Sequence, residues 1–201
     1  IVLIILVDET LNSDLTKLAL RKSFLKKRHA LSDQEHEDKS FAIANNCLKL
    51  PIWHLDYYHI YLPIKAKAEI DTTLILTLLQ GKDKQVILPK IKGSELEHIL
   101  LTDITKLKIN GLGISEPEKG IKISPEQIDV IFLPLLAWDK SGNRLGYGKG
   151  FYDNFLSLCK TNTIKVGLSF FDPVDKIIDI RSEDIKMDFC VNSEGIKKFN
   201  S

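Results

Sequence analysis

Apolar and polar positions alternate along the chain in two patterns, one with the period of a helix and one with the period of a strand. Apolar residues at helical spacing predict a helix from Leu15 to about Arg28, with Asp14 as its N-cap. Ser32 followed by Glu35 is a capping box, which predicts a second helix that reaches about Leu48. The chain therefore begins its ordered part with two consecutive helices.

Strands and helices then alternate. Tyr57 to Leu62 is aromatic and β-branched, which favours a strand, and Pro63 is expected to stop it. Asp71 can cap a helix that Gly81 ends. The remaining predictions are strands at 85–88 (ended by Pro89), 96–101, 106–109, 128–136 and 164–170, a helix at 151–159, and a turn-rich stretch at 111–120. This alternation predicts a single three-layer α/β/α domain around a mainly parallel sheet.

Length and composition agree with one domain. The 201 residues are 44% hydrophobic and 27% charged, and no repeat or long linker divides them, so residues 14–201 are expected to form the domain. Residues 1–13 are assigned to an N-terminal extension of unknown role. Its apolar run ends after seven residues, whereas a membrane span needs roughly 20, and it lacks the flanks of a signal peptide.

The net charge and the cysteine content limit the expected binding partners and the expected compartment. A net charge of +1 argues against a strongly basic nucleic-acid surface. The three cysteines, Cys47, Cys159 and Cys190, lie far apart and form no C-x-x-C pair, which favours a reducing compartment. We therefore expect a cytoplasmic protein that has neither a membrane nor nucleic acid as partner, and for its oligomeric state we expect a monomer.

The segment from Asp139 to Asp153 is the most informative part of the sequence. Four of the 11 glycines fall in it, between a predicted buried strand and a predicted helix. Glycines at alternate positions free the backbone and leave amide groups open, so that such a loop before a helix suits a phosphate group. Arg144 and Lys149 add charge of the matching sign. The alternative is a flexible surface loop that happens to be rich in glycine.

Two known phosphate motifs do not fit this segment. A Walker motif needs Ser or Thr directly after its Gly-Lys, whereas Gly150 follows Gly148-Lys149. The dinucleotide pattern G-x-G-x-x-G fails because the third glycine comes one residue too early. The five histidines also lack paired metal-ligand spacing, which makes a zinc site a poor interpretation.

The same segment resembles a known family. Leu133 to Asp139, followed by Gly142 to Asp153, is similar to the signature of 5-formyltetrahydrofolate cyclo-ligases, also called methenyltetrahydrofolate synthetases. Four further matches follow in order along the chain: Lys17 to Arg21, Tyr61-Leu62 with Glu69 to Thr72, Gly113 to Pro117, and Asp184 to Asp188. The resemblance covers about 15–196, so it extends over nearly the whole chain.

The resemblance implies an ATP- and Mg²⁺-dependent ring closure. In this family the formyl oxygen of 5-formyltetrahydrofolate takes the γ-phosphoryl group of ATP. The atom N10 then attacks the activated carbon, and loss of phosphate gives 5,10-methenyltetrahydrofolate. Because a formamide oxygen is a poor leaving group, phosphorylation makes the closure feasible, and phosphoryl transfer asks a protein mainly for positioning and charge neutralisation.

Site residues carry over from the resemblance as follows. Nucleotide binding is implied for Lys17, Arg21, Arg144, Leu145, Gly146, Tyr147, Gly148, Lys149, Gly150, Phe151 and Tyr152. Folate binding is implied for Leu62, Glu69, Tyr147, Gly148, Lys149, Gly150 and Phe151. Catalytic roles fall to Arg144, Lys149 and Tyr152, and Mg²⁺ binding to Asp153 and Asp184.

Each role has a plainer alternative. Lys17 and Arg21 share one helical face by their i, i+4 spacing, but that face could simply be solvated. Asp153 and Glu69 could only favour a helix terminus, Asp184 could be a turn residue, and Tyr152 could be a packing residue.

The sequence also departs from the family at three points: Trp138 replaces a common Phe, Asn154 stands where a basic residue is frequent, and position 151 differs as well. Phe151 stands where the family usually has a first tyrosine, so any role of that hydroxyl is in doubt. Two other functions therefore stay open: a nucleotide- or folate-binding module without turnover, and a related α/β enzyme that acts on a sugar phosphate.

Overall fold

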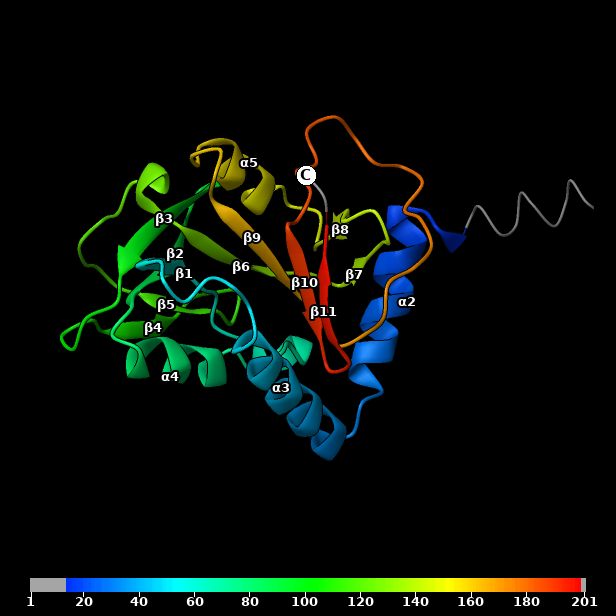
Figure 1. The fold of residues 1–201 in the computed structure, drawn as a ribbon, viewed down its shortest axis with the longest axis horizontal. Coiled ribbons are helices and arrows are strands. Elements are labelled where there is room, and N and C mark those ends of the chain that lie inside the picture. Colours follow the sequence, from blue (N-terminus) through cyan, green and yellow to red (C-terminus); the bar gives the residue numbers. More distant parts are fainter. Residues whose placement is uncertain (1–13, 200–201) are drawn as a thin grey trace, which may run out of the picture.

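The computed structural model describes residues 14–199. The predicted N-terminal extension, residues 1–13, lies outside this part. The fold is a seven-stranded sheet in the order β11-β10-β9-β6-β1-β2-β3 (Figure 1). Its strands are β1 (Tyr57–His59), β2 (Gln85–Lys92), β3 (Glu95–Leu100), β6 (Val130–Pro134), β9 (Ile164–Leu168), β10 (Phe189–Asn192) and β11 (Gly195–Lys198).

The central strands run parallel, and only the two edge strands, β3 and β11, pair antiparallel with their neighbours. This confirms the mainly parallel sheet. Two small antiparallel pairs stand apart from it: β4 (Leu107–Ile109) with β5 (Ser115–Pro117), and β7 (Ala137–Trp138) with β8 (Arg144–Leu145).

The helices are α2 (Lys17–His29), α3 (Asp33–Cys47), α4 (Thr73–Gly81) and α5 (Phe151–Ser157), with short 3₁₀ turns η1 (Lys65–Lys67) and η2 (Pro125–Gln127). The capping box of Ser32 and Glu35 is confirmed at the start of α3. The prediction that Asp14 caps the first helix is wrong. Thr16 is the N-cap, because its backbone is extended and its hydroxyl accepts a hydrogen bond from the Ala19 amide.

Helices cover both faces of the sheet, as predicted. Alternate strand residues such as Tyr58, Val86 and Phe132 pack with α3 and α4 in one fully buried cluster. Their neighbours, such as Ile87 and Ile131, face α5 on the other side. Figure 1 shows α5 across the sheet from α3 and α4. Helix α2 packs against the β7–β8 pair instead, and no helix among residues 14–199 has the length and apolar character to cross a bilayer.

Several strand boundaries differ from the prediction. Strand β1 ends at His59, so Ile60 to Leu62 leave the sheet and lead toward the site. Strand β2 continues through Pro89. Beyond Ile87 the strand pairs only with β3, so the missing N–H of Pro89 on the side of β1 removes no hydrogen bond from the sheet. Asp71 lies one position before Thr72, the N-cap of α4, and its carboxylate accepts from the Thr73 amide.

The turn between β7 and β8 is tightly held. Asp139 is fully buried, and its carboxylate accepts hydrogen bonds from the backbone of Ser141, Asn143 and Ile177 and from the Asn143 side chain. Gly142 has a φ of +86°, and a Cβ there would lie 2.9 Å from the ring of Phe199. This packing fixes the stem from which the glycine-rich loop, residues 144–152, emerges.

Candidate active site

A cavity of about 720 Å³ opens beside the glycine-rich loop. Its walls come from α2, from the segment after β1, from β2 and β3, from the β4–β5 pair, and from the loop before β10. All the residues to which the sequence assigns a role line it: Lys17, Arg21, Leu62, Glu69, Arg144, Leu145, Gly146, Tyr147, Gly148, Lys149, Gly150, Phe151, Tyr152, Asp153 and Asp184. Segments that lie up to 167 positions apart, Lys17 and Asp184, thus meet in one place.

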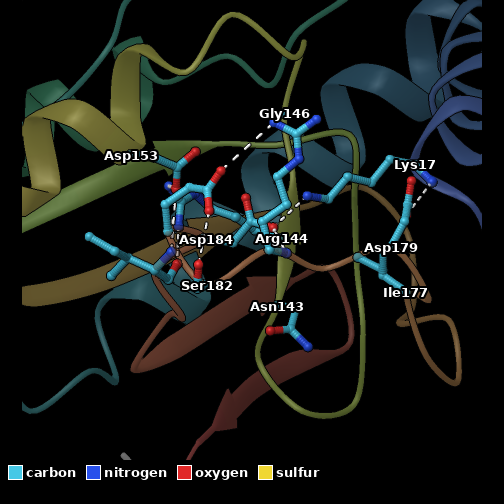
Figure 2. A network of polar contacts seen from close by, with 12 residues as sticks. Lys17, Asn143, Arg144, Gly146, Asp153, Ile177, Asp179, Ser182 and Asp184 are labelled. Carbon is cyan, nitrogen blue, oxygen red and sulfur yellow. Dashed lines mark hydrogen bonds and ion pairs between the residues drawn. The ribbon is translucent and has the colours of Figure 1, made fainter.

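One part of the cavity is charged. Arg144 pairs with Asp153 at 2.6 Å and also donates to the Ile185 carbonyl, while Lys17 pairs with Asp184. These side chains form one network of polar contacts (Figure 2). Burial alone would raise the pKa of Asp184, but the Arg181 amide and the Lys17 ammonium outweigh it and lower the pKa.

These contacts bear on the plainer alternatives for Lys17, Asp153 and Asp184, while their ligand-binding roles stay predictions. The Lys17 side chain is only 12% exposed, so this end of α2 is not a freely solvated basic face. Asp153 does lie in the first turn of α5, but its carboxylate reaches Arg144 rather than only the helix end. Asp184 is a turn residue, since its carboxylate accepts from the Arg181 amide, and it also pairs with Lys17 across the site, while its Mg²⁺ role stays a prediction.

The glycine-rich loop lies directly against α2. The Nε atom of Arg21 donates to the Gly146 carbonyl at 3.0 Å. Gly148 has a φ of +86°, and a Cβ there would lie 3.0 Å from the Arg21 guanidinium carbon, so the close approach of loop and helix depends on glycine. The loop thus places its backbone beside an arginine, which is the arrangement expected for a phosphate-binding segment.

Two polar side chains of the loop stay available for a ligand. Lys149 is exposed and makes no hydrogen bond or ion pair with residues 14–199. The Tyr152 hydroxyl likewise makes no hydrogen bond within the described residues, and burial followed by the charge of Glu69 raises its pKa, so that it remains protonated. Both line the cavity, where one offers a positive charge and the other an O–H donor.

The other part of the cavity combines one carboxylate with apolar walls. Glu69 is 5% exposed, and its two oxygens accept from the Ile64 amide at 2.8 Å and from the Tyr147 hydroxyl at 2.6 Å. The apolar side chains that line the same cavity include Leu62, Ile91, Leu96, Leu112 and Ile114. A buried carboxylate in an apolar pocket suits a flat ring with adjacent N–H donors.

The two carboxylates of the charged part fit a divalent cation. Within residues 14–199 no group of three or more His, Cys, Asp or Glu side chains could form an all-protein metal cage. Mg²⁺ needs only one or two carboxylates when phosphate oxygens and waters complete its shell. Asp153 Oδ2 and Asp184 Oδ1 accept no hydrogen bond from the described residues, so each carboxylate keeps one oxygen for such an ion.

Some residues of this site escaped the sequence analysis. Arg28 is buried and donates to the Tyr147 hydroxyl, although an arginine on a helix is usually solvated. Lys67 lies 4.0 Å above the Tyr147 ring. Neither could be found from spacing alone, because both contacts join segments 80 to 119 positions apart.

Comparison with known proteins agrees with this geometry. A family model described as the 5-formyltetrahydrofolate cyclo-ligase family matches residues 14–188. The chain belongs to this family. Family membership confirms the resemblance that the glycine-rich segment and the four other matches predicted.

Relatives of the family share the length of the chain. A probable 5-formyltetrahydrofolate cyclo-ligase of Schizosaccharomyces pombe is 28% identical over 183 residues, which cover 83% of this chain and 89% of the relative. The NMR structure of Aquifex aeolicus 5,10-methenyltetrahydrofolate synthetase is 33% identical with a TM-score of 0.80, and covers 92% of this chain and 93% of that one. A synthetase structure from Mycoplasma pneumoniae is 26% identical with a TM-score of 0.70, covering 88% and 98%.

Proposed function

We propose that this chain is an ATP-dependent 5-formyltetrahydrofolate cyclo-ligase, which forms 5,10-methenyltetrahydrofolate, ADP and phosphate. One observation carries the proposal: the glycine-rich loop borders two different chemistries in one cavity. Through Gly146 and Arg144 it touches the charged part, and through Tyr147 it touches the carboxylate of the apolar part. A nucleotide and a folate could therefore meet on either side of one loop.

The reaction needs two bond exchanges. The formyl oxygen forms a bond to the γ-phosphorus while the bridging bond to ADP breaks. The atom N10 then bonds to the activated carbon and loses its proton, and the carbon–oxygen bond to phosphate breaks. In both exchanges negative charge gathers on phosphate oxygens, so positive groups held in place lower the barrier.

The residues of the charged part supply this positioning. Lys17 and Arg21 on α2 would hold the phosphate chain, and Lys149 would neutralise charge on the transferred group. Arg144 is fixed by Asp153 and the Ile185 carbonyl, so it presents a preorganised charge. Asp153 and Asp184 would hold Mg²⁺, which supplies charge neutralisation at the phosphates when bound.

The residues of the apolar part would bind the folate. Glu69 would accept hydrogen bonds from the N–H groups of the pterin-type ring. A carboxylate has about four acceptor sites, and the Ile64 amide and the Tyr147 hydroxyl use two of them, so the other sites remain for the ring. Leu62 and Phe151 would pack against the ring system, and Tyr152 would donate toward the formyl group. The backbone at Gly148 and Gly150 leaves room for both ligands because neither position carries a side chain.

The test is direct. Purified chain mixed with MgATP and 5-formyltetrahydrofolate should develop the near-ultraviolet absorbance of the methenyl product, and chelation of Mg²⁺ should stop it. Binding of nucleotide and folate without any product would reject the proposal in favour of a binding module. Turnover of a sugar phosphate without ATP would reject it in favour of the other α/β enzyme.

Lys149→Ala should lower kcat about 100-fold, because it removes a charge that acts on the transferring group. The melting temperature should not change, since the side chain is exposed and unpaired within residues 14–199. Lys22→Ala is the matched control, because Lys22 is an exposed lysine of α2 outside the cavity. Equal kcat values for the two variants would contradict the role of Lys149.

Two accompanying predictions complete the proposal. We expect a cytoplasmic enzyme and a monomer. Gel filtration with light scattering should give a mass near 22.8 kDa if the monomer is correct.

A further inference from the structure

Arg28 lies in the last turn of α2, on the buried side of the helix, and is only 4% exposed. Its guanidinium donates from Nη2 to the Leu135 carbonyl at 2.6 Å and from Nη1 to the Tyr147 hydroxyl at 2.9 Å. A buried arginine is rare unless its charge is used, because desolvation of an unpaired cation is costly. The burial of Arg28 therefore indicates that its positive charge interacts with a negative charge nearby.

The direction of the hydrogen bonds follows from chemistry. Arginine can only donate, so the Tyr147 oxygen accepts from Arg28. The single proton of that hydroxyl is then left for Glu69 Oε1, which lies 2.6 Å away. Burial, followed by the charge of Glu69, raises the pKa of Tyr147, so the hydroxyl keeps this proton at neutral pH. The three side chains thus form a chain of donors that ends on the carboxylate.

The position of Glu69 depends on this chain. Its other oxygen accepts from the Ile64 amide at 2.8 Å, which leaves the hydroxyl of Tyr147 to fix the rotation of the carboxylate. The Tyr147 ring is itself held from one side by Lys67, whose ammonium lies 4.0 Å from the ring centre. The hydroxyl, however, is oriented only by Arg28 among the described donors.

We propose that Arg28 is a positioning residue, which acts through the Tyr147 hydroxyl to orient the Glu69 carboxylate and so sets the affinity for the folate substrate. The inference rests on the proposed function and deepens it. It also gives α2 two tasks, since Lys17 and Arg21 at its start face the charged part of the cavity while Arg28 at its end supports the apolar part.

A purely structural role would look different. If Arg28 only satisfied the Leu135 carbonyl, its loss would lower stability and impair both ligands alike, whether or not Tyr147 kept its hydroxyl. Positioning through Tyr147 instead predicts that the two residues have non-independent effects on folate affinity and that loss of Arg28 leaves ATP affinity unchanged.

The experiment is a double-mutant cycle on folate binding without turnover. The dissociation constant of 5-formyltetrahydrofolate is measured by calorimetry for wild type, Arg28→Met, Tyr147→Phe and the double variant, and that of ATP is measured alongside. Each single substitution should weaken folate binding about tenfold, the size expected for a hydrogen bond to a charged group. The double variant should bind folate about tenfold more weakly as well, and ATP binding by Arg28→Met, whose side chain does not line the cavity, should stay within about twofold of wild type.

Controls separate positioning from loss of stability. Asn46→Ala removes a side chain that donates to the Asn192 and Ser193 carbonyls and does not line the cavity, so it should lower the melting temperature without changing either dissociation constant. If Arg28→Met does not fold, Arg28→Lys takes its place in the cycle, because it keeps the charge but not the fork that reaches Leu135 and Tyr147 together.

The outcomes distinguish failure of the proposed function from failure of the proposed role of Arg28. A wild-type protein that neither binds nor converts 5-formyltetrahydrofolate rejects the proposed function. A wild-type protein that does both, with independent effects that multiply to about 100-fold, overturns the role of Arg28 alone. Equal weakening of ATP and folate in the Arg28 variant overturns it too.

Discussion

Two histidines buried behind α5 should make the stability of the protein depend on pH. The His59 and His98 rings lie 5.3 Å apart and pack on Phe155, His98 in a stack at 3.9 Å. His59 is fully buried and His98 is 5% exposed. Neither nitrogen of His59 has a hydrogen-bond partner within residues 14–199, nor does Nδ1 of His98. Both rings are therefore neutral in the folded protein.

The size of the effect follows from linkage. Burial, followed by the charge of His98, lowers the pKa of His59 well below 6.5, and burial lowers the pKa of His98 to about 4. As the pH falls below about 6.5, both histidines bind protons in the unfolded chain but stay neutral in the folded protein, so the free energy of unfolding falls. Between pH 7 and pH 5 each histidine costs about 2 kcal/mol, or about 4 kcal/mol for the pair.

Urea unfolding measured at half-unit steps from pH 7 to pH 5 checks this value. Carboxylates with lowered pKa values, such as Asp129 and Asp184, lose their contribution at lower pH and do not obscure this window. His59→Leu should halve the loss to about 2 kcal/mol while keeping or raising stability at pH 7, because it removes an unpaired polar ring. An unfolding free energy that stays flat between pH 7 and pH 5 would refute the reasoning.

Two further substitutions test the loop and its stem. Gly148→Ala should raise the KM for ATP about tenfold with a small change in melting temperature, because a Cβ at φ +86° would press on Arg21; an unchanged KM would show that the loop can move away. Asp139→Asn should lower the free energy of unfolding by about 2–4 kcal/mol in urea titrations, since an amide offers one acceptor atom where four N–H groups now donate; a loss below about 1 kcal/mol would contradict this.

Local signals in the sequence predicted local features well. The capping box at Ser32 and the strand over the apolar run of β6 each depend on a few residues and are confirmed, as is the position of the glycine-rich segment before α5. Strands β10 and β11 escaped prediction, because Phe189–Asn192 and Gly195–Lys198 are too short for a clear period and owe their structure to pairing at the sheet edge.

The candidate site shows the same division. Spacing placed Lys17 and Arg21 on one helical face, and the family resemblance supplied Glu69, Asp153 and Asp184. Nothing in the sequence indicated that His59 and His98 would lie close together, because they are 39 positions apart and belong to β1 and β3, which flank β2 in the sheet. The burial of Arg28 also depends on its distant partners, since a helical arginine is usually solvated.

The contact of Phe199 with Gly142 has a consequence for how the protein is made. During synthesis the glycine-rich loop leaves the ribosome well before 189–199, yet its stem is packed by a ring from that late segment. The outer edge of β9 also stays open until β10 arrives beside it. A nascent chain therefore cannot complete the stem of its glycine-rich loop until the β10–β11 hairpin has left the ribosome and docked.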